Sequence, residues 1–236
     1  MEYVALTDVG MKRHNNEDSY IVNVTENDKI FIVADGMGGH NAGEIASLEA
    51  CRITESYILE HKGDIDITLK EGVLKANRDI FVRAGENQNL RGMGTTIDAC
   101  VLRDNVLHIA HVGDSRVYVI NNDEIRKITK DHSIVGMMLE EGSITEEEAK
   151  LHLQRNYITR AVGTSVNLEI DIICEEVHSG EWVLMCTDGL TNMVDKGELH
   201  SIVINAESVD AAACSLVKKA KDNGGDDNIT VVLFRV

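Results

Sequence analysis

The 236-residue sequence contains no proline, although proteins on average use about 5%. Every turn must therefore be built from residues such as Gly, Asn and Asp, and no cis-proline can slow folding. The sequence also lacks an apolar run approaching the ~20 residues of a membrane-spanning helix. Its first residues, Met1 to Val4, show none of the regions of a signal peptide, so we expect a cytoplasmic protein outside the membrane.

Basic residues are scarce: 23 Lys and Arg stand against 40 Asp and Glu, which leaves a formal net charge of −17. This charge argues against broad contact with nucleic acid or anionic lipid, unless a local patch supplies counter-charge. The five cysteines are an odd, widely spaced number without any C-x-x-C pair, so we expect buried, reduced thiols. The length suits one domain, and we expect a monomer.

The apolar pattern predicts helices and strands in separate blocks. Apolar residues recur at helical spacing in 46–57, 69–80, 144–153 and 209–220. Short β-branched runs occupy 30–34, 97–102, 106–112, 117–120, 170–177, 182–186 and 229–236. The connections 103–105 and 121–124 are so short that they can join only antiparallel neighbours. These observations predict an α+β fold in which helices are layered on antiparallel sheets.

Aspartates stand at the ends of four predicted strands: Asp35, Asp114, Asp188 and Asp227. Turn chemistry alone could explain each of them, because Asp and Gly are favoured after strands. Alternatively, several strand ends lie at one edge of the sheets and bring their carboxylates together. The carboxylates would then repel one another, so this arrangement requires a cation. Oxygen ligands would favour Mg²⁺ or Mn²⁺ over Zn²⁺. Nothing in the periodicity says that the four aspartates meet.

Other phosphate and hydrolase chemistries find little support. The glycine-rich segment 35–43 follows a predicted strand but lacks the third Gly or Ala of a dinucleotide loop, and Asp35 would oppose a pyrophosphate. No Gly is followed by Lys and then Ser or Thr, so the P-loop pattern is absent. The H-E-x-x-H and G-x-S-x-G patterns are also missing, which removes the main support for zincin and α/β-hydrolase interpretations.

Short polar motifs follow one another along nearly the whole chain. They are TDVG (7–10), RHNNEDS (13–19), VADGMGGH (33–40), GTT (94–96), HVGDSR (111–116), KDHS (130–133), ITRAVG (158–163), CTDGL (186–190) and DDNIT (226–230). In this order they resemble the metal-dependent Ser/Thr protein phosphatases, the PPM or type 2C family, in its compact bacterial branch. Each motif alone is weak, whereas the ordered set is highly specific.

The resemblance implies a four-layered αββα sandwich of two antiparallel sheets flanked by helices. It implies one catalytic domain over residues 1–236, with a flap at about 133–156. The implied activity is hydrolysis of phosphoserine and phosphothreonine in proteins, by direct attack of a water that bridges two metal ions. Mn²⁺ or Mg²⁺ is the implied cofactor, with two ions at the core site and a third beside them.

The resemblance also implies the metal ligands. Asp35 would bridge both ions, Asp188 and Asp227 would hold the first, and the carbonyl of Gly36 would bind the second. Asp114 would hold the third ion together with Asp188. Two further carboxylates that would act through metal-bound water are Glu17 and Asp18.

Arg13 and His40 would act on the substrate. The guanidinium of Arg13 would grip the phosphate, for which its planar fork is suited. His40 is a candidate general acid for the leaving alkoxide, or else a structural histidine. Eukaryotic members carry their histidine two residues after the equivalent of Asp35, and here that position is Met37. His111 and His132 are the other histidines nearest the motifs.

The expected partners are phosphorylated proteins, among them a Ser/Thr protein kinase and its targets. One alternative is a catalytically silent relative that binds phosphoproteins and regulates them. Such a relative is expected to have lost a bridging or terminal carboxylate, whereas Asp35, Asp188 and Asp227 are all present. A narrower alternative is a stage-specific phosphatase that acts on a single partner. Such a phosphatase would be distinguished by extra domains, which this sequence lacks.

Overall fold

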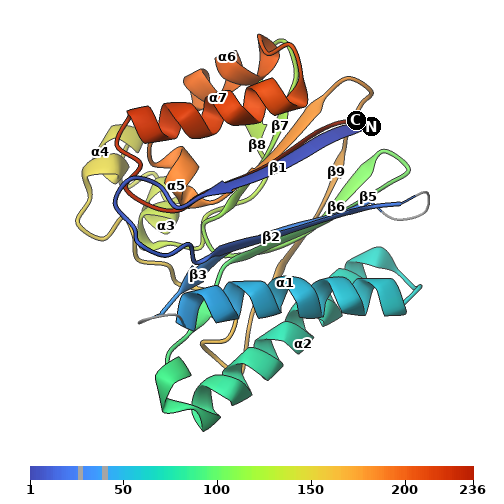
Figure 1. The fold of residues 1–236 in the computed structure, drawn as a ribbon, viewed down its shortest axis with the longest axis vertical. Coiled ribbons are helices and arrows are strands. Elements are labelled where there is room, and N and C mark those ends of the chain that lie inside the picture. Colours follow the sequence, from blue (N-terminus) through green and yellow to red (C-terminus); the bar gives the residue numbers. More distant parts are fainter. Residues whose placement is uncertain (26–28, 39–41) are drawn as a thin grey trace.

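The computed structural model describes residues 1–25, 29–38 and 42–236, whose elements form four layers (Figure 1). Two antiparallel sheets pack face to face in the middle, and helices cover their outer faces. This architecture confirms the predicted α+β class and the αββα sandwich. His40 lies outside the described residues.

One sheet has the strand order β2-β3-β5-β6-β9, with β4 paired to β3. Helices α1 (Ala42–Glu60) and α2 (Ile65–Glu86) cover its outer face, and a short 3₁₀ helix, η1 (Gln88–Leu90), follows α2. Apolar residues at helical spacing, such as Ala46 and Val73, pack with Ile32 of the sheet in one core. The strands are β2 (Asp18–Val24), β3 (Lys29–Met37), β4 (Gly94–Thr95), β5 (Ile97–Arg103), β6 (Val106–Val112) and β9 (Asp171–Glu176).

The second sheet has the order β1-β11-β10-β7-β8. Its outer face is covered by α6 (Lys196–Ile204) and α7 (Val209–Asp222), where Leu199 and Leu216 pack against Leu184 and Val231. The strands are β1 (Glu2–Asp8), β7 (Arg116–Ile120), β8 (Ile125–Lys127), β10 (Trp182–Cys186) and β11 (Ile229–Arg235).

The two sheets share an inner core because their central strands are apolar on both faces. Along β3, Ile32 faces the helices while Phe31 faces the other sheet. Along β11, Leu233 faces α7 while Phe234 stacks on Phe31, with 4.0 Å between the ring centroids. Burial on both faces explains the continuous apolar runs from which the sequence predicted these strands.

The apolar pattern missed β1, β2 and α6. The strands β1 and β2 end the strand orders of their sheets, and many of their residues are partly exposed, so neither carries a continuous apolar run. Helix α6 has nine residues, too few for a clear helical repeat, and it begins where the side chain of Asp195 accepts a hydrogen bond from the Glu198 amide.

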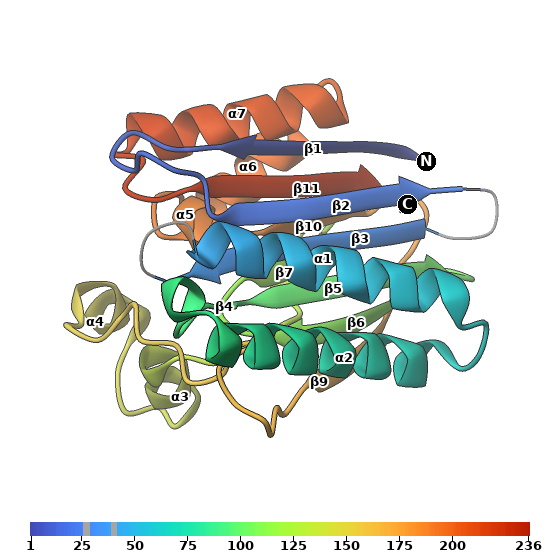
Figure 2. The ribbon, with the colours of Figure 1, turned by 60° about the horizontal axis from the view of Figure 1, so that its bottom comes forward.

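Residues 133–156, which we expect to form a flap, contain α3 (Ile134–Glu140) and α4 (Glu146–Leu151). The side chains of Thr145 and Glu148 form a capping box that starts α4 inside the predicted window 144–153. Figures 1 and 2 both place α3 and α4 at the end of the sandwich where β2 begins and β3 ends. That a flap moves over the substrate stays a prediction.

The expectation of buried thiols is wrong for two cysteines. All five are free among the described residues, but Cys174 on β9 and Cys214 on α7 are exposed, whereas Cys51, Cys100 and Cys186 are buried. The exposed pair lie in elements that border solvent, an edge strand and an outer helix, which the local apolar pattern does not reveal. Within the described ranges, every helix is too short or too polar to cross a bilayer.

Candidate metal and phosphate site

Asp35 stands near the end of β3, and the strand register brings Asp18 opposite it at the start of β2. The backbone of Asp35 is held on its other side by the strand pair that follows η1. Its amide donates to the Thr96 hydroxyl at 2.9 Å, and its carbonyl accepts from the Thr95 hydroxyl at 2.8 Å. The position of the Asp35 carboxyl group is therefore set by hydrogen bonds from neighbouring strands.

Asp18 joins the two sheets. One of its oxygens, Oδ2, accepts hydrogen bonds from the hydroxyls of Thr187 at 2.9 Å and Thr230 at 2.7 Å. Thr187 follows β10 and Thr230 lies on β11, so both donors belong to the sheet opposite β2. Asp18 is only 7% exposed, and within the described part of the chain its other oxygen, Oδ1, has no hydrogen-bond partner.

Asp188 is the first residue of a short helix, α5 (Asp188–Thr191), directly after Thr187. Its Oδ2 accepts a hydrogen bond from Asn192 at 3.0 Å, whereas its buried Oδ1 finds no partner among the described residues. Gly189 has to be glycine here, because a Cβ would lie 1.9 Å from the Asn228 carbonyl oxygen. This close approach holds α5 against the segment that precedes β11.

Asp227 and Asn228 lie immediately before β11. Asn228 organises the chain around them: its Oδ1 accepts from the Glu17 amide at 2.8 Å, and its Nδ2 donates to the carbonyls of Val9 and Asn15. Asp227 accepts from the guanidinium of Arg13 at 2.8 Å. Segments about 210 residues apart in the sequence are thereby joined at the start of β11.

Gly36 also permits a close approach of backbones. A Cβ on Gly36 would lie 2.1 Å from the carbonyl oxygen of Gly43 and 2.5 Å from that of Glu17. Its amide donates to the Glu17 carbonyl at 3.1 Å. The side chain of Glu17 lies against Gly43 in the first turn of α1, where a Cβ would lie 2.8 Å from Glu17 Oε1, and burial raises the pKa of Glu17.

The carboxyl groups at this end of the sandwich repel one another. Burial, followed by the charges of Asp18, Asp188, Asp114 and Asp227, raises the pKa of Asp35 well above its usual range. Burial and the same kind of repulsion raise the pKa of Asp18 to about 7 and that of Asp114 to about 7. The pKa of Asp188 is raised by burial and by Asp227.

These residues fit divalent cations. Without an ion, the carboxyl groups must bind protons to share this volume, because their burial and mutual repulsion raise their pKa values. The unpartnered buried oxygens of Asp18 and Asp188 are further acceptors without a donor. The set consists of oxygens, which hard ions such as Mg²⁺ and Mn²⁺ prefer.

Asp114 follows Gly113, whose φ of +115° lets the chain turn between β6 and β7. Its neighbour Arg116 makes a two-pronged ion pair with Asp131, with a shortest contact of 2.8 Å. The guanidinium of Arg116 is therefore paired with Asp131, and the negative charge of Asp188 repels that of Asp114.

His111 and His132 are engaged in a buried network that the sequence did not predict. His111 contacts Asp98 through Nδ1 at 2.6 Å and donates through Nε2 to the Lys130 carbonyl at 2.7 Å. Burial disfavours the protonated ring of His111, but the charge of Asp98 and its hydrogen bond outweigh this effect, so the pKa of His111 is raised. His132 accepts from the Gly113 amide through Nδ1. Both rings thus have structural partners, and neither is free to deliver a proton to a leaving group.

A carboxylate cluster between two antiparallel sheets, with an arginine at its rim, suits metal-dependent hydrolysis of phosphate esters. Residues 11–218 match the family described as protein phosphatase 2C. The serine/threonine phosphatase stp of Listeria welshimeri is 38% identical over 96% of this chain and 92% of its own length. The chain belongs to the protein phosphatase 2C family and is a Ser/Thr protein phosphatase.

Solved structures agree with this assignment. The serine/threonine phosphatase Stp1 from Staphylococcus aureus is 33% identical, with a TM-score of 0.95 over 100% of this chain and 94% of that one. The catalytic domain of PstP, solved with two manganese ions, is 34% identical with a TM-score of 0.88, over 98% and 96% of the respective chains. Metal dependence is thus a property of the family.

Sequence reasoning missed the residues that position the carboxylates. Thr187, Thr230 and Asn228 lie inside the motifs at 186–190 and 226–230. From these motifs the sequence predicts only Asp188 and Asp227 as site residues. All three have side chains that form hydrogen bonds, and all three lie within three residues of a predicted ligand at a strand end. This pattern could have identified them from the sequence.

Proposed function

We propose that this phosphatase hydrolyses phosphoserine and phosphothreonine directly, with two divalent metal ions and without a covalent intermediate on the protein. The buried carboxyl cluster around Asp35, whose members raise each other's pKa, is the observation that supports this proposal. When bound, the metal ions would lower the pKa of a water molecule so that it can attack phosphorus at neutral pH. Mn²⁺ and Mg²⁺ are the ions that oxygen ligands favour.

The ligand assignments are part of the proposal. Asp35 would contribute to holding both ions, Asp188 and Asp227 would complete the ligands of the first, and the Gly36 carbonyl would serve the second. Asp114 and Asp188 would hold a third ion, and their mutual repulsion supports a cation there. Glu17 and Asp18 would act through metal-bound water.

The chain's own residues then have distinct tasks. Thr187 and Thr230 donate to one oxygen of Asp18, and among the described residues the other oxygen has no hydrogen-bond partner. Asn228 fixes the backbone of Glu17. Arg13, paired with Asp227 at 2.8 Å and half-exposed, is placed to exchange part of this ion pair for a phosphate dianion.

The decisive experiment follows hydrolysis of a phosphothreonine peptide with Mn²⁺, with and without EDTA. Release of phosphate that requires Mn²⁺ supports the proposal, whereas full turnover by thoroughly chelated protein contradicts it. Single-turnover quenching should show no phosphorylated protein, since no side chain serves as nucleophile.

Replacing Arg13 by Ala should raise KM for a phosphopeptide by about 10- to 100-fold, because a charge-assisted contact contributes about 1.5–3 kcal/mol. The change in kcat should be smaller, since the pair with phosphate exists before and during attack. Lys12→Ala is the matched control: Lys12 forms a somewhat more exposed ion pair with the neighbouring Asp226 at 2.6 Å. An unchanged KM with a collapsed kcat would move Arg13 into a transition-state role.

For His40 we propose the role of general acid, supported by its position in the motif at 33–40 and by the engagement of His111 and His132 elsewhere. His40→Gln should lower kcat on a phosphothreonine peptide by about 100-fold, yet change hydrolysis of p-nitrophenyl phosphate little, because p-nitrophenolate leaves without protonation. Steady-state kinetics on both substrates measures this, with the exposed His14→Gln as control. Equal losses on both substrates would refute the role.

The substrates are phosphoproteins, as for the family. We propose that a Ser/Thr protein kinase and its targets in the cytoplasm are among them, that the protein acts as a monomer, and that residues 1–236 form one domain. The segment 133–156 would serve as a flap over the substrate, which its place at the end of the sandwich where β3 ends supports (Figure 2).

A further inference from the structure

A second group of metal-binding side chains lies on the other face of the β2-containing sheet, where α2 begins. Asp66 is in the first turn of α2, His108 is on β6 and Cys174 is on the edge strand β9. The register of β6 and β9 places His108 directly opposite Cys174, so their side chains share one face of the sheet. Asp66 reaches both of them from the helix above.

The donor atoms of these three residues lie within 4.8 Å of one another. His108 Nδ1 is 2.7 Å from Asp66 Oδ1 and 3.6 Å from Cys174 Sγ. Cys174 Sγ is 3.3 Å and 3.4 Å from the two oxygens of Asp66. Ligands around a tetrahedral zinc ion are about 3.5 Å apart, so these side chains would need to move by less than about 1 Å to enclose one.

The geometry does not suit a nucleophilic relay. In such a relay the thiol contacts one nitrogen of the imidazole and the carboxylate contacts the other. The ring can then take the proton from sulfur while the carboxylate stabilises the positive charge that forms on the ring. Here both Asp66 and Cys174 approach the same nitrogen, Nδ1 of His108. Three atoms that converge on one point are the arrangement of ligands around an ion.

We propose that Asp66, His108 and Cys174 bind a zinc ion. Thiolate and imidazole select Zn²⁺ over Mg²⁺ and Mn²⁺, whereas the site around Asp35 offers only oxygens, so the two sites differ in the metal they take. Without an ion, burial and the hydrogen bond to Asp66 raise the pKa of the Cys174 thiol, and binding releases its proton to solvent.

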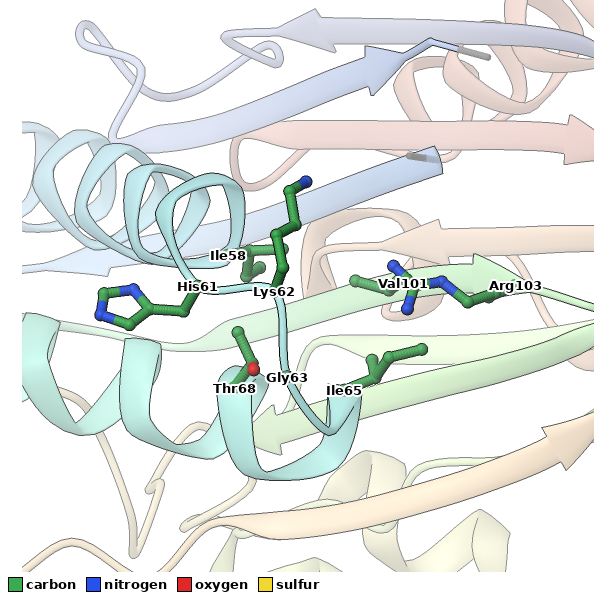
Figure 3. Close-up of a pocket in the computed structure, with 8 residues that line it drawn as sticks. All are labelled: Ile58, His61, Lys62, Gly63, Ile65, Thr68, Val101 and Arg103. Carbon is green, nitrogen blue, oxygen red and sulfur yellow. The ribbon is translucent and has the colours of Figure 1, made fainter. Parts of the chain in front are cut away.

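Solvent can supply the fourth ligand. Cys174 is exposed, and His108 and Asp66 are partly so, with side-chain exposures of 19% and 38%. A pocket of about 100 Å³ lies beside the turn between α1 and α2 (Figure 3). Its wall includes Ile65, which precedes Asp66, and Val101, which lies opposite His108 in the pairing of β5 and β6. Three protein ligands and one water make a complete zinc site.

Zinc at this point would tie the start of α2 to the edge strand β9. Among the described residues, α2 has backbone contact mainly with α1 and β6, and β9 pairs with β6 alone. The cross-link would therefore stabilise an edge of the sandwich remote in sequence from the catalytic aspartates. The proposal does not rest on the catalytic assignments, because it concerns other side chains and another metal.

The test uses the 236-residue chain in excess Mg²⁺, which occupies the oxygen-donor site, and titrates it with Co²⁺ in place of zinc. One equivalent should produce the near-ultraviolet charge-transfer band of a thiolate bound to Co²⁺, and stoichiometric Zn²⁺ should abolish it. Cys174→Ser should lack the band, while Cys214→Ser, which changes the other exposed cysteine, should keep it.

His108→Gln and Asp66→Asn should weaken zinc binding by at least about 10- to 100-fold, the loss seen when a residue that merely supports a ligand is removed. Circular dichroism and Mn²⁺-dependent phosphatase activity check that each variant folds, and both should be unchanged by Cys174→Ser. The proposal is overturned if the wild-type chain shows no band, or if the band survives in Cys174→Ser.

Discussion

Replacing Asp35 by Asn should lower kcat on a phosphothreonine peptide by about 1000-fold at saturating Mn²⁺. A catalytic metal ion contributes several kcal/mol to transition-state stabilisation, and each 1.36 kcal/mol is a factor of about ten in rate. The change should exceed that for any other single carboxylate, since Asp35 would be shared by two ions. Asn keeps the backbone hydrogen bonds to Thr95 and Thr96, so the strand end should stay in place.

The same substitution should make the metal-free protein more stable. Asp35 is repelled by Asp18, Asp188, Asp114 and Asp227, so a neutral side chain removes the strain that the ions would otherwise relieve. Thermal unfolding in EDTA should show a higher Tm for Asp35→Asn than for wild type, with a smaller rise on adding Mn²⁺. Wild-type turnover by the variant, or an unchanged response to Mn²⁺, would remove Asp35 from the bridging position.

Asp123→Asn is the matched control for Asp35→Asn. Asp123 is exposed in the turn between β7 and β8, and its backbone amide donates to Asn121. It carries the same charge and undergoes the same chemical change, but it lies away from the carboxyl cluster. Its kcat, its Tm in EDTA and its response to Mn²⁺ should match those of the wild-type chain.

Without metal, the protein should become less stable as pH rises from 5 to 7.5. The pKa of Asp18 is raised from 3.8 to about 7 in the folded state, mainly by burial. Between these values the folded state binds more protons than the unfolded state, so its stability falls with rising pH until the folded pKa is passed. For Asp18 alone the loss between pH 5 and 7.5 is about 2.5 kcal/mol, a fall of about 5–10 °C in Tm.

Differential scanning calorimetry in EDTA at several pH values measures this loss. Mn²⁺ should raise Tm much more at pH 7.5 than at pH 5, because the cations replace protons that the carboxyl groups have lost. In Asp18→Asn the pH dependence should be flatter, because an amide does not titrate. The local structure should persist, since the Thr187 and Thr230 hydroxyls can still donate to the amide oxygen. A metal-free Tm that rises between pH 5 and 7.5 in wild type would contradict the raised pKa.

The strands at 97–102 and 106–112 were predictable because they are apolar on both faces and joined by a connection of three residues. The strands β1 and β2 were not, since each borders its sheet on one side and carries a mixed pattern. Among the cysteines, Cys174 lies in a run predicted as a strand, but only its place at the sheet edge exposes it.

The sequence by itself determined the fold class, the family and the identity of the acidic residues at the strand ends, because motifs and apolar periodicity are local properties of the chain. Only the tertiary structure decided which groups meet. Asp18 receives its hydroxyl donors from residues 169 and 212 positions away, on the opposite sheet. His108 and Cys174 face each other through strand register, and Asp66 joins them through helix packing. Contacts of this kind depend on how whole layers pack, and no local pattern records that.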